Sequence, residues 1–459
     1  MSGHRFAPQI LREYDIRGTV GETLSEDDAY ALGRSYGAIL QARDGRLVCV
    51  GYDGRLSSPA LEARLVDGLC ASGMRVMRIG LGPTPALYFA APAMAADGGI
   101  MVTGSHNPPD HNGFKMMLGA GPFWGDDIQK LGDIAARGAW TDGEGDAQPV
   151  ALLETYVARL RTDYAATRGL KVAWDAGNGA AGEAMRMLTA LLPGEHVLLN
   201  AEIDGTFPAH HPDPTVPENL IQLQDAVADE GCDLGIAFDG DGDRIGVVDG
   251  QGRILWGDQL LSIYARDLLS RRAGATVIAD VKASQVLFDE IERCGGNPVM
   301  AATGHSIIKS KMAELSAPLA GEMSGHIFFA DRYYGFDDAL YAAVRLLDIV
   351  ARADRSLAAM RDALPQVVNT PEIRFDVAED RKFAVVDEVK ARLAETDANV
   401  DDTDGVRVLS EHGWWLLRAS NTQAVLVVRC ESENEEGLSR LKAAVAGQLG
   451  LSGIDAQVF

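Results

Sequence analysis

A serine in a proline-containing turn is the first group in this sequence that could exchange a phosphoryl group covalently. Ser105 lies in the segment TGSHNPP at 103–109, directly after the apolar run 99–102. The prolines and the glycine force a turn at the end of a strand, so the Ser105 hydroxyl is expected to project from a fixed loop. It could be a nucleophile or a phosphate carrier, and an ordinary turn is the alternative. The segment lacks the Gly-x-Ser-x-Gly pattern of acyl-transfer serines.

Three aspartates at alternate positions could bind a divalent cation. Asp239, Asp241 and Asp243 are separated by glycines in the segment DGDGDR, which closes an apolar strand-like run. Glycines let the backbone fold tightly, so the three carboxylates can converge on one hard cation such as Mg2+. An EF-hand calcium loop needs Gly at its sixth position and Glu at its twelfth, where this chain has Arg244 and Gly250. A solvated acidic turn is the remaining alternative.

Further polar segments have the side chains that bind sugars and phosphates. GEMSGH at 321–326 offers a carboxylate, a hydroxyl and an imidazole, which suit sugar hydroxyls. RASNT at 418–422 lies between two strand-like runs, and its arginine, neutral side chains and backbone N–H groups suit a phosphate that is held without being transferred. His305 opens a helix-like stretch. The alternatives are a polar turn, a hairpin with an exposed arginine and a helix-terminal histidine without a chemical task.

A glycine-rich turn gives a weak match to a dinucleotide site. The segment GNGAAG at 177–182 fits the G-x-G-x-x-G pattern after a strand-like run. Asp175 precedes it, and its charge would disfavour a pyrophosphate, so a tight strand-to-helix turn is favoured. A dinucleotide-dependent oxidoreductase that uses Gly177, Gly179 and Gly182 is kept as the alternative from another functional class. No phosphate loop of the G-x-x-x-x-G-K-[ST] type occurs in the sequence.

The elements that must position these groups alternate between strand-like and helix-like runs, which predicts α/β layers around mostly parallel sheets. Several of the apolar runs end at an aspartate, which indicates three related α/β units. The strand-like runs are 48–52, 172–174, 234–238 and 276–279, their terminal aspartates are Asp53, Asp175, Asp239 and Asp280, and the helix-like segments are 58–72, 182–192, 217–229 and 285–293.

The C-terminal part of the chain has a different pattern, which predicts a smaller α+β domain. Its strand-like runs are 373–375, 406–409, 414–417 and 425–428, and its helix-like runs are 381–394 and 436–449. Boundaries near residues 150, 253 and 365 divide the chain into domains at 1–150, 151–253, 254–365 and 366–459. Four domains leave a natural central cleft, where ligands commonly bind.

Composition limits the class of protein. The 459 residues include 42 Lys and Arg against 66 Asp and Glu, a net charge of −24, with 47% apolar and 24% charged residues. This is a globular composition, and its acidity argues against nucleic-acid or anionic-membrane contact, so a phosphorylated ligand needs a local basic pocket. The sequence has no membrane-length apolar run, no signal peptide and no CxxC pair. We therefore expect a soluble cytoplasmic protein whose five cysteines are reduced and buried.

Together these segments resemble the α-D-phosphohexomutase family, particularly its bacterial phosphomannomutase/phosphoglucomutase branch. The resemblance spans nearly the whole chain and depends on the order of several motifs. They are EYDIRG at 13–18, TGSHNPPDHNGFK at 103–115, FPAHHPDP at 207–214, DGDGDR at 239–244, GEMSGH and RASNT. The family fold implies three related α/β domains with mixed, mostly parallel sheets and a C-terminal α+β domain of TATA-box-protein-like topology, arranged around a central cleft.

The resemblance also implies roles for the matched residues. Ser105 would carry the phosphoryl group and would bind Mg2+ together with Asp239, Asp241 and Asp243. The other catalytic positions would be Arg17, Lys115, Arg244 and His305, with the general acid and base left open. Glu322 and Ser324 would contact sugar hydroxyls, and Arg418, Ser420, Asn421 and Thr422 would hold the phosphate that is not transferred. Tyr14, Lys282 and His326 complete the substrate-binding set.

The implied reaction interconverts hexose 1-phosphate and hexose 6-phosphate. Phosphorylated Ser105 would donate to the sugar, and the resulting 1,6-bisphosphate would turn over and return its other phosphoryl group, which implies hinge motion of the C-terminal domain. Met323 matches the branch that accepts both mannose and glucose. Glucose 1,6-bisphosphate would be the activator, hexose phosphates the partners, and the protein a monomer or weak homodimer. A non-catalytic sugar-phosphate sensor is a third hypothesis, against which the retained serine and aspartates argue.

Overall fold

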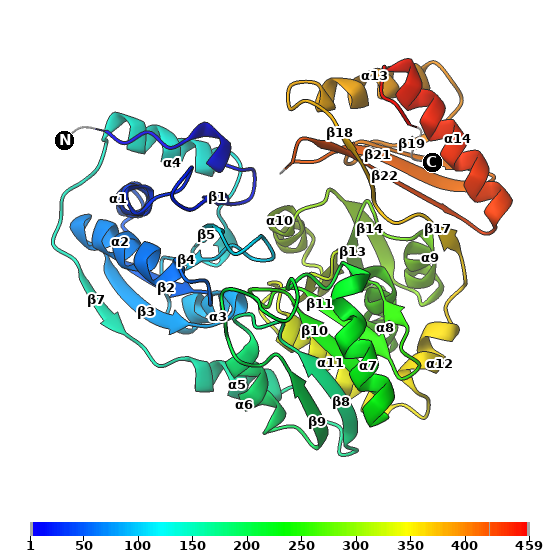
Figure 1. Cartoon of the computed structure of the whole chain (residues 1–459), viewed down its shortest axis with the longest axis horizontal. Coiled ribbons are helices and arrows are strands. Elements are labelled where there is room, and N and C mark those ends of the chain that lie inside the picture. Colours follow the sequence, from blue (N-terminus) through cyan, green and yellow to red (C-terminus); the bar gives the residue numbers. More distant parts are fainter. Residues whose placement is uncertain (1–2, 422, 457–459) are drawn as a thin grey trace.

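Four sheets with their helices make up the protein in a computed structural model that describes residues 3–421 and 423–456 (Figure 1). The first unit has the strand order β1-β5-β4-β2-β3-β7, with β6 paired to β5. Its elements are η1 (Pro8–Ile10), β1 (Ile16–Thr19), α1 (Glu26–Gln41), β2 (Leu47–Tyr52), α2 (Ser58–Ala71), β3 (Arg75–Leu81), α3 (Thr84–Ala93), β4 (Gly98–Val102), β5 (His111–Leu118), β6 (Gly121–Pro122), α4 (Asp126–Arg137) and β7 (Asp146–Pro149).

The second unit has the strand order β12-β11-β10-β8-β9. Its elements are α5 (Leu153–Arg161), β8 (Leu170–Asp175), α6 (Gly182–Thr189), β9 (Gly194–Leu199), η2 (Pro217–Leu220), α7 (Ile221–Glu230), β10 (Leu234–Phe238), β11 (Ile245–Asp249) and β12 (Ile254–Leu255). The helix predicted at 182–192 ends early, because Pro193 disfavours the helical conformation of the residue before it. The helix predicted at 217–229 begins as the single 3-10 turn η2.

The third unit has the strand order β14-β13-β15-β16. Its elements are α8 (Gly257–Arg271), β13 (Thr276–Asp280), α9 (Gln285–Arg293), β14 (Asn297–Ala301), α10 (His305–Leu315), β15 (Leu319–Gly321), β16 (Ile327–Phe329), α11 (Ala339–Arg352) and α12 (Leu357–Asp362).

The C-terminal unit is an antiparallel sheet ordered β17-β22-β21-β20-β19, with β18 also paired to β22 and two helices packed on it. Its elements are β17 (Val368–Asn369), β18 (Ile373–Asp376), α13 (Lys382–Ala394), β19 (Asn399–Asp401), β20 (Val406–Ser410), β21 (Gly413–Ala419), β22 (Val425–Ser432) and α14 (Glu435–Leu451). The predicted change of class in this part of the chain is confirmed. The likeness of its topology to TATA-box-binding protein stays a prediction.

The first three sheets repeat one topology. The orders β3-β2-β4-β5, β9-β8-β10-β11 and β14-β13-β15-β16 each place three parallel strands beside one antiparallel strand. The predicted relationship between three α/β units is therefore confirmed. Asp53, Asp175 and Asp280 stand at the end of the equivalent strand in each repeat, while Asp239 follows the next strand of the second repeat.

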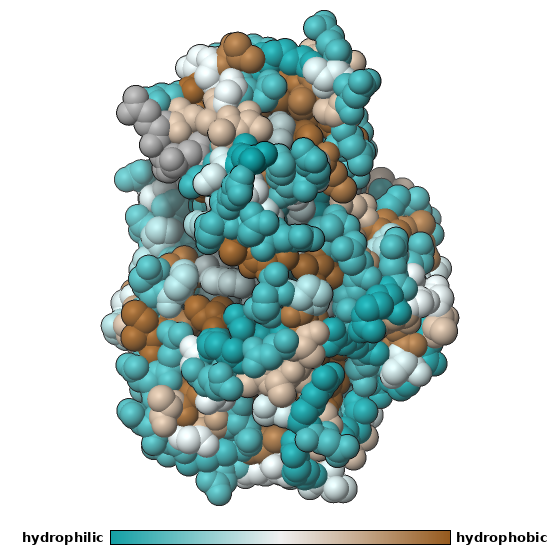
Figure 2. All heavy atoms as spheres, turned by 90° about the vertical axis from the view of Figure 1, so that its right-hand side faces the viewer, coloured by the Kyte–Doolittle hydropathy of each residue, from teal (hydrophilic) through white to brown (hydrophobic). Residues whose placement is uncertain are grey.

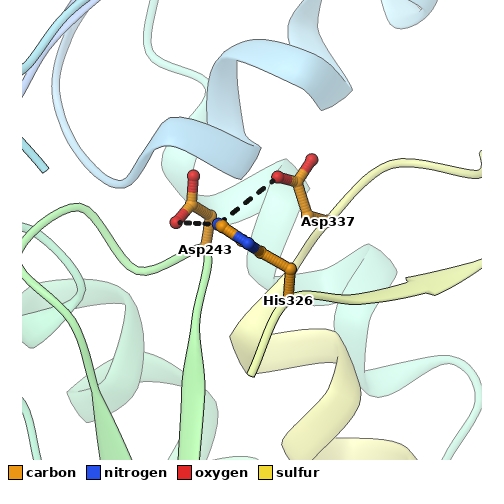
Figure 3. Close-up of side chains that lie close together, drawn as sticks. All are labelled: Asp243, His326 and Asp337. Atoms are coloured by element: carbon orange, nitrogen blue, oxygen red, sulfur yellow. Dashed lines mark ion pairs between the residues drawn. The ribbon is translucent and has the colours of Figure 1, made fainter. Parts of the chain in front are cut away.

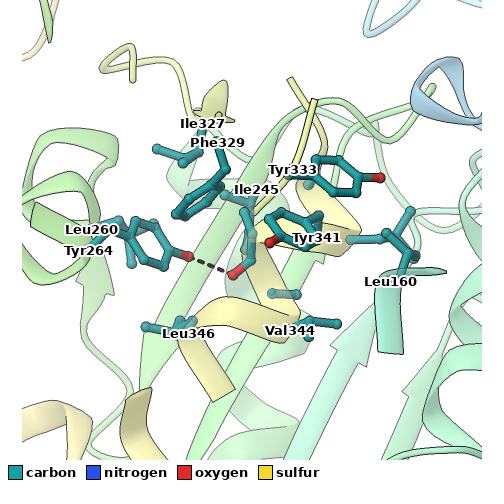
Figure 4. Close-up of a cluster of buried hydrophobic side chains, with 14 of the residues drawn as sticks. Leu160, Ile245, Leu260, Tyr264, Ile327, Phe329, Tyr333, Tyr341, Val344 and Leu346 are labelled. Carbon is teal, nitrogen blue, oxygen red and sulfur yellow. Dashed lines mark hydrogen bonds between the residues drawn. The ribbon is translucent and has the colours of Figure 1, made fainter. Parts of the chain in front are cut away.

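One hydrophobic core connects the first three units, and the fourth has a core of its own. Helix α11 is almost entirely buried where the second and third units meet. Figure 4 shows Leu160 and Ile245 from the second unit packed with Tyr264, Phe329 and other side chains of the third. The C-terminal unit meets the third through the small apolar cluster of Val281, Trp414 and Leu416 and through the buried Arg407, which donates to the Val281 and Ala283 carbonyls. This contact is smaller in apolar content than the core that joins the first three units.

The exterior agrees with the acidic composition. Figure 2 shows one face on which hydrophilic side chains predominate and apolar ones are scattered between them. Within residues 3–421 and 423–456, no helix has the length and apolar character that a membrane crossing requires. All five cysteines are unpaired. Three are buried as predicted, but Cys70 and Cys294 are partly exposed, because each lies at the C-terminal end of a surface helix.

Candidate active site

The three site loops of the α/β units occupy the same position in the repeat. The Ser105 loop joins β4 to β5, the aspartate loop joins β10 to β11, and the GEMSGH loop joins β15 to β16. Equivalent loops follow the carboxyl ends of parallel strands, where α/β sheets bind ligands. The last two loops touch directly, because the Ile245 backbone N–H donates to the Gly325 carbonyl at 3.0 Å. The repeat therefore explains why segments far apart in the sequence meet.

Ser105 lies against the aspartate loop in a backbone conformation that few non-glycine residues adopt. Its φ is +50°, and its N–H donates to the Thr103 hydroxyl at 2.8 Å. Its Oγ lies 3.2 Å from the Asp239 carboxylate and 3.2 Å from His106 Nδ1. The expectation of a fixed loop is confirmed. The hydroxyl does not project into open space, however, because Ser105 is only 2% exposed, so a ligand reaches it after neighbouring side chains move.

The three aspartates converge as predicted. Asp239, Asp241 and Asp243 are completely buried and bring one oxygen each within 4.8 Å of the others. Asp239 Oδ1 accepts the backbone N–H groups of Asp243 and Arg244, both at 3.1 Å, which closes the loop. The tight backbone that the interleaved glycines allow therefore points the carboxylates inward rather than into solvent, which excludes the solvated acidic turn.

The carboxylate triplet fits a hard divalent cation. Lys115 Nζ donates to Asp241 Oδ2 at 2.7 Å and also contacts Asp243. Asp241 Oδ1 and Asp243 Oδ1 have no hydrogen-bond partner in the described part of the chain, and both are buried. Burial, with the charges of Asp243 and Asp241, raises the pKa of Asp239 well above its ordinary value. Three crowded carboxylates with two spare oxygens are the donor set that Mg2+ would satisfy.

A second group of possible metal ligands shares Asp243 with the triplet. Figure 3 shows His326 between Asp243 and Asp337, with Nε2 at 3.3 Å from Asp243 Oδ1 and 3.9 Å from Asp337 Oδ2. Two cations already contact this group, since Lys309 donates to Asp337 at 2.9 Å and Arg244 Nε lies 3.2 Å from His326 Nε2. We therefore interpret it as an ion-pair network that orients His326.

The pKa values of two histidines of the site are shifted in opposite directions. Burial alone would lower the pKa of His326, but Asp243 and Glu322 raise it to about 9. Burial, aided by Lys309 and Lys115, holds the pKa of His305 well below its ordinary value. The two ring centroids are 5.7 Å apart. Neighbouring groups whose pKa values are pushed apart are suited to the two halves of acid–base catalysis.

Glu322 is less available than the sequence predicts. Its Oε2 lies 2.7 Å from His326 Nδ1, and its Oε1 accepts the Gly304 N–H at 2.7 Å. Both oxygens therefore have protein partners, so binding a sugar hydroxyl would mean sharing one of them. Ser324 Oγ lies 3.3 Å from the same His326 nitrogen and is partly exposed.

Residues 418–421 run from the end of β21 into the turn before β22, which confirms the predicted place between two strands, and Arg418 is buried, which excludes the exposed arginine of the alternative. Arg418 Nε donates to Asp404 Oδ2 at 2.9 Å, and the same oxygen accepts the Thr303 N–H at 3.0 Å. Ser420 Oγ accepts the Gln423 N–H at 3.2 Å. Asp404 thus connects the C-terminal unit to the third unit at the arginine expected to bind phosphate. Thr422 lies outside the described residues.

Tyr14 connects three units at one hydroxyl. It donates to the Thr303 carbonyl at 2.8 Å and accepts from Asn421 Nδ2 at 2.6 Å. Gly304 makes room for this ring, since a Cβ there would stand 2.6 Å from the Tyr14 Cζ. Tyr14 and Asn421, which are both predicted to bind the substrate, are therefore in contact. The first, third and C-terminal units meet at the Tyr14 hydroxyl.

The remaining predicted cations have acidic or amide partners. Arg17 donates to Asn107 Oδ1 at 3.1 Å and pairs with Asp15, which places it on the Ser105 loop. Lys282 donates to Glu372 at 2.7 Å, and this pairing lowers the pKa of Glu372 to about 2. Lys282 thus joins the third unit to the C-terminal unit.

The glycine-rich turn at 177–182 is filled by protein. Its Gly179 faces the Gly240 carbonyl, 2.8 Å from where a Cβ would be, and Gly182 faces the Ala201 carbonyl at 2.2 Å. Asp175 accepts the Gly177 N–H at 2.8 Å. These close approaches are why the glycines are needed, and they leave a pyrophosphate no space, so the favoured structural interpretation holds.

Comparison with known proteins decides the family. The chain matches phosphoglucomutase/phosphomannomutase alpha/beta/alpha domains I, II and III at residues 8–141, 153–252 and 256–368, and the C-terminal domain at 372–448. The phosphomannomutase/phosphoglucomutase of Pseudomonas aeruginosa is 46% identical over 440 residues, which cover 96% of this chain and 95% of that protein. The chain belongs to the phosphoglucomutase/phosphomannomutase family. The resemblance seen in the motifs is confirmed.

Other members of the phosphoglucomutase/phosphomannomutase family agree. The phosphoglucomutase of Neisseria meningitidis is 41% identical over 440 residues, with 95% of both chains covered. The structure of a family protein from Burkholderia thailandensis superposes with a TM-score of 0.93 at 42% identity and covers 98% of both chains. The protein is thus a phosphohexomutase, an isomerase, as the motifs implied.

Sequence reasoning missed several residues of this phosphohexomutase site. Arg55, Asp337, Asp404 and Glu372 contact the predicted side chains or their loops and lie outside the quoted motifs. Only Arg55 had a usable signal, because it stands two residues after a strand-ending aspartate, as Lys282 does after Asp280. The others are single acidic residues in polar turns, which nothing in the sequence distinguishes.

Proposed function

We propose that the protein interconverts the 1- and 6-phosphates of glucose and mannose through phosphorylated Ser105 and a hexose 1,6-bisphosphate intermediate. The observation that carries the proposal is the contact of Ser105 Oγ with Asp239, 3.2 Å away, inside a buried carboxylate triplet. The names of the relatives from Pseudomonas and Neisseria support both sugars.

Phosphoryl transfer needs the negative charge of phosphoserine to be offset. In the forward step a sugar hydroxyl attacks phosphorus, a P–O bond to the sugar forms, and the P–Oγ bond of Ser105 breaks. Arg17 and Arg244 flank this point and would neutralise the phosphoryl oxygens. Mg2+, held by Ser105 and the three aspartates, would supply further charge neutralisation when bound. Lys115 would keep Asp241 and Asp243 ionised, since its charge helps to hold their pKa values below the ordinary value.

Two protons must move with the phosphoryl group. The attacking sugar hydroxyl loses a proton, and Ser105 Oγ gains one as it leaves. We assign these transfers to the His305 and His326 pair, of which one imidazole is held neutral and the other protonated. His305 is suited to accept a proton and His326 to donate one.

The phosphate that is not transferred needs a binding site without a reactive group. We assign it to Arg418, Ser420, Asn421 and Thr422, with Tyr14, Lys282, Glu322, Ser324 and His326 around the sugar. Arg418 pairs with Asp404, so on substrate binding it would exchange this carboxylate for the incoming phosphate. That exchange would release the Asp404 contact to Thr303 and loosen the C-terminal unit for bisphosphate reorientation.

The remaining assignments follow from the architecture. The predicted boundary at 253 falls just before β12, which pairs with β11 of the second sheet, so we propose divisions near residues 150, 255 and 365 as the domain boundaries. Unpaired cysteines support a reducing compartment, the cytoplasm. Glucose 1,6-bisphosphate is proposed as the primer that phosphorylates Ser105, and the protein as a monomer or weak homodimer.

A coupled assay tests the proposal. Glucose 1-phosphate and mannose 1-phosphate are supplied separately with Mg2+ and catalytic glucose 1,6-bisphosphate, and formation of the 6-phosphates is followed. We expect conversion of both sugars and dependence on the primer in protein that has been dephosphorylated. Absence of conversion for either sugar, with the primer and Mg2+ present, would refute the proposed reaction.

Replacing Arg418 by alanine is expected to weaken substrate binding more than turnover. The guanidinium would contact the phosphate equally in ground and transition states, so its loss raises KM by about 10- to 100-fold and changes kcat by less than about tenfold. Steady-state kinetics with glucose 1-phosphate measures both. Arg440→Ala is the control, since Arg440 is an exposed arginine of the same unit that pairs with Glu436 and His412. An unchanged KM in Arg418→Ala would remove this loop from the binding site.

A further inference from the structure

A buried arginine outside every matched motif lies beneath the Ser105 loop. Arg55 follows β2 and is 1% exposed. Its guanidinium donates to four backbone carbonyls of the loop, at distances between 2.5 and 2.9 Å. The carbonyls are those of Ser105, Asn107, Pro108 and His111. A planar guanidinium presents its donors in a rigid fork, so one side chain fixes both ends of the loop.

Asp53 holds the start of the same loop. Its Oδ2 accepts the Thr103 hydroxyl at 2.8 Å and the Gly104 N–H at 3.1 Å. The same oxygen lies 3.2 Å from Arg55 Nε, and Oδ1 accepts the Arg55 N–H at 3.0 Å. Asp53 and Arg55 thus form one buried pair that binds the donors at the start of the loop and the acceptors further along it.

The loop has no freedom to settle differently while this pair is in place. A Cβ at Gly104 would stand 2.4 Å from Arg55 Nε, and a Cβ at Gly240 would stand 2.3 Å from the Ser105 carbonyl. The Ser105 carbonyl is therefore enclosed between Arg55 and the aspartate loop. With its carbonyl and N–H both bonded, Ser105 is kept at positive φ and its Oγ faces Asp239.

The structural repeat shows that this use of a cation is particular to the first unit. Position two after the strand-ending aspartate is Arg55 in the first repeat, Gly177 in the second and Lys282 in the third. Lys282 points away to Glu372 of the C-terminal unit. Among the three repeats, the one that carries Ser105 is the one whose cation at this position bonds the site loop of its own repeat.

We infer that Arg55 is a positioning residue for phosphoryl transfer, which aims Ser105 Oγ at the aspartate triplet through the four loop carbonyls. The inference rests on the proposed role of Ser105. The guanidinium is fully engaged with the backbone, and it acts through the loop rather than on a ligand. Its loss should therefore slow the transfer step and leave the distant phosphate grip at Arg418 unaffected.

The test compares Arg55→Lys with Arg34→Lys. Lysine keeps the charge but offers a single point of donation, which cannot serve four carbonyls. Arg34 is a matched control, since it is a buried arginine of the same unit that bonds Asp142 and Tyr30 and lies outside the Ser105 loop. We expect Arg55→Lys to lower kcat about 100-fold with KM within about threefold, because small misplacements of reacting groups cost about that much. Arg34→Lys should keep wild-type kcat.

A single-turnover measurement separates this inference from the proposed function. Dephosphorylated protein is mixed with glucose 1,6-bisphosphate, and the phosphoryl group on Ser105 is followed by intact mass. Wild-type protein that gains no phosphoryl group would refute the proposed function itself. Wild-type labelling with an equally fast Arg55→Lys would overturn only the inference, and so would a KM effect in place of the kcat effect, or an equal kcat loss in Arg34→Lys.

Gly104→Ala provides a second approach if Arg55→Lys fails to fold. The added methyl group would stand 2.4 Å from Arg55 Nε and 2.8 Å from the His111 carbonyl, so it would separate the guanidinium from the loop without removing it. It should slow labelling of Ser105 while leaving KM unchanged. Labelling at the wild-type rate in a folded Gly104→Ala protein would also overturn the inference.

Discussion

Ser105→Ala is expected to abolish mutase activity, with a loss of at least about 10^4-fold in kcat, because the covalent carrier of the phosphoryl group is removed. The fold should survive. Alanine can adopt the same backbone conformation as serine, and the hydrogen bonds that the Ser105 hydroxyl makes among the described residues are those with Asp239 and His106. In Ser105→Ala the Asp239 carboxylate loses one hydrogen-bond donor, but it can still bind a cation. We therefore expect a melting temperature within a few degrees of wild type.

Intact mass decides whether the lost activity is the lost carrier. Protein incubated with glucose 1,6-bisphosphate should gain the mass of one phosphoryl group, and Ser105→Ala should not. Ser35→Ala is the control, because Ser35 is a buried serine of the same unit that accepts a hydrogen bond from Trp140 and lies outside the site. The Ser35→Ala protein should still gain the phosphoryl group and keep its activity. A retained phosphoryl group in Ser105→Ala, or turnover within tenfold of wild type, would move the chemistry to another residue.

The sequence was informative wherever a local pattern also determined the local structure. The alternating Asp and Gly residues at 239–243 can only turn tightly, and the structure closes them on a single point. The strand-ending aspartates signalled a repeat, and the repeat is what brings the three site loops to one place. The same aspartates have a second task that the pattern did not reveal, since Asp53 and Asp280 each accept a backbone N–H from a site loop.

What could not be predicted depends on contacts between distant residues. Glu322 stays a predicted sugar contact, but nothing in the sequence shows that His326 and the Gly304 N–H already bond its two oxygens. Asp404 gives no sign in the sequence that it pairs with Arg418 and Thr303. Arg55 looks like a surface residue of a polar turn, and only the folded chain shows four carbonyls around it. Such partners are chosen by packing of whole units, which composition and periodicity do not encode.

Asp241→Asn is the second substitution with a large expected effect. It should lower kcat on the order of 10^3-fold and remove the stabilisation by Mg2+, and the metal-free protein should lose some stability. Asp241 is one of three completely buried carboxylates, and its Oδ1 has no hydrogen-bond partner in the structure described for residues 3–421 and 423–456. Burial and the Asp243 charge act to raise the pKa of Asp241, but Lys115 and Thr84 hold it below its ordinary value, so the ionised form is favoured in the folded protein.

Asp241→Asn also removes an ion pair with Lys115. Asp241 Oδ2 accepts from Lys115 and Thr84, but Lys115 keeps its contact with Asp243, so the buried ammonium does not become unpaired. An asparagine oxygen can accept the same two hydrogen bonds. Because one partner remains for every donor, the cost is smaller than that of breaking an isolated buried pair, which is several kcal/mol. Asp241→Asn should therefore destabilise the metal-free protein, by less than that amount.

Thermal unfolding with and without Mg2+ makes the prediction decisive. At Mg2+ about 100-fold above its dissociation constant, binding to the folded state stabilises wild type by about 2.7 kcal/mol. Asp241→Asn should show almost none of this shift, and chelation should abolish wild-type activity until Mg2+ is restored. Asp249→Asn is the matched control, a buried aspartate of the same unit paired with Arg253 at 2.8 Å. It should lose stability without Mg2+ and keep the Mg2+ shift. If Asp241→Asn behaved like Asp249→Asn, the triplet would be structural and the metal would bind elsewhere.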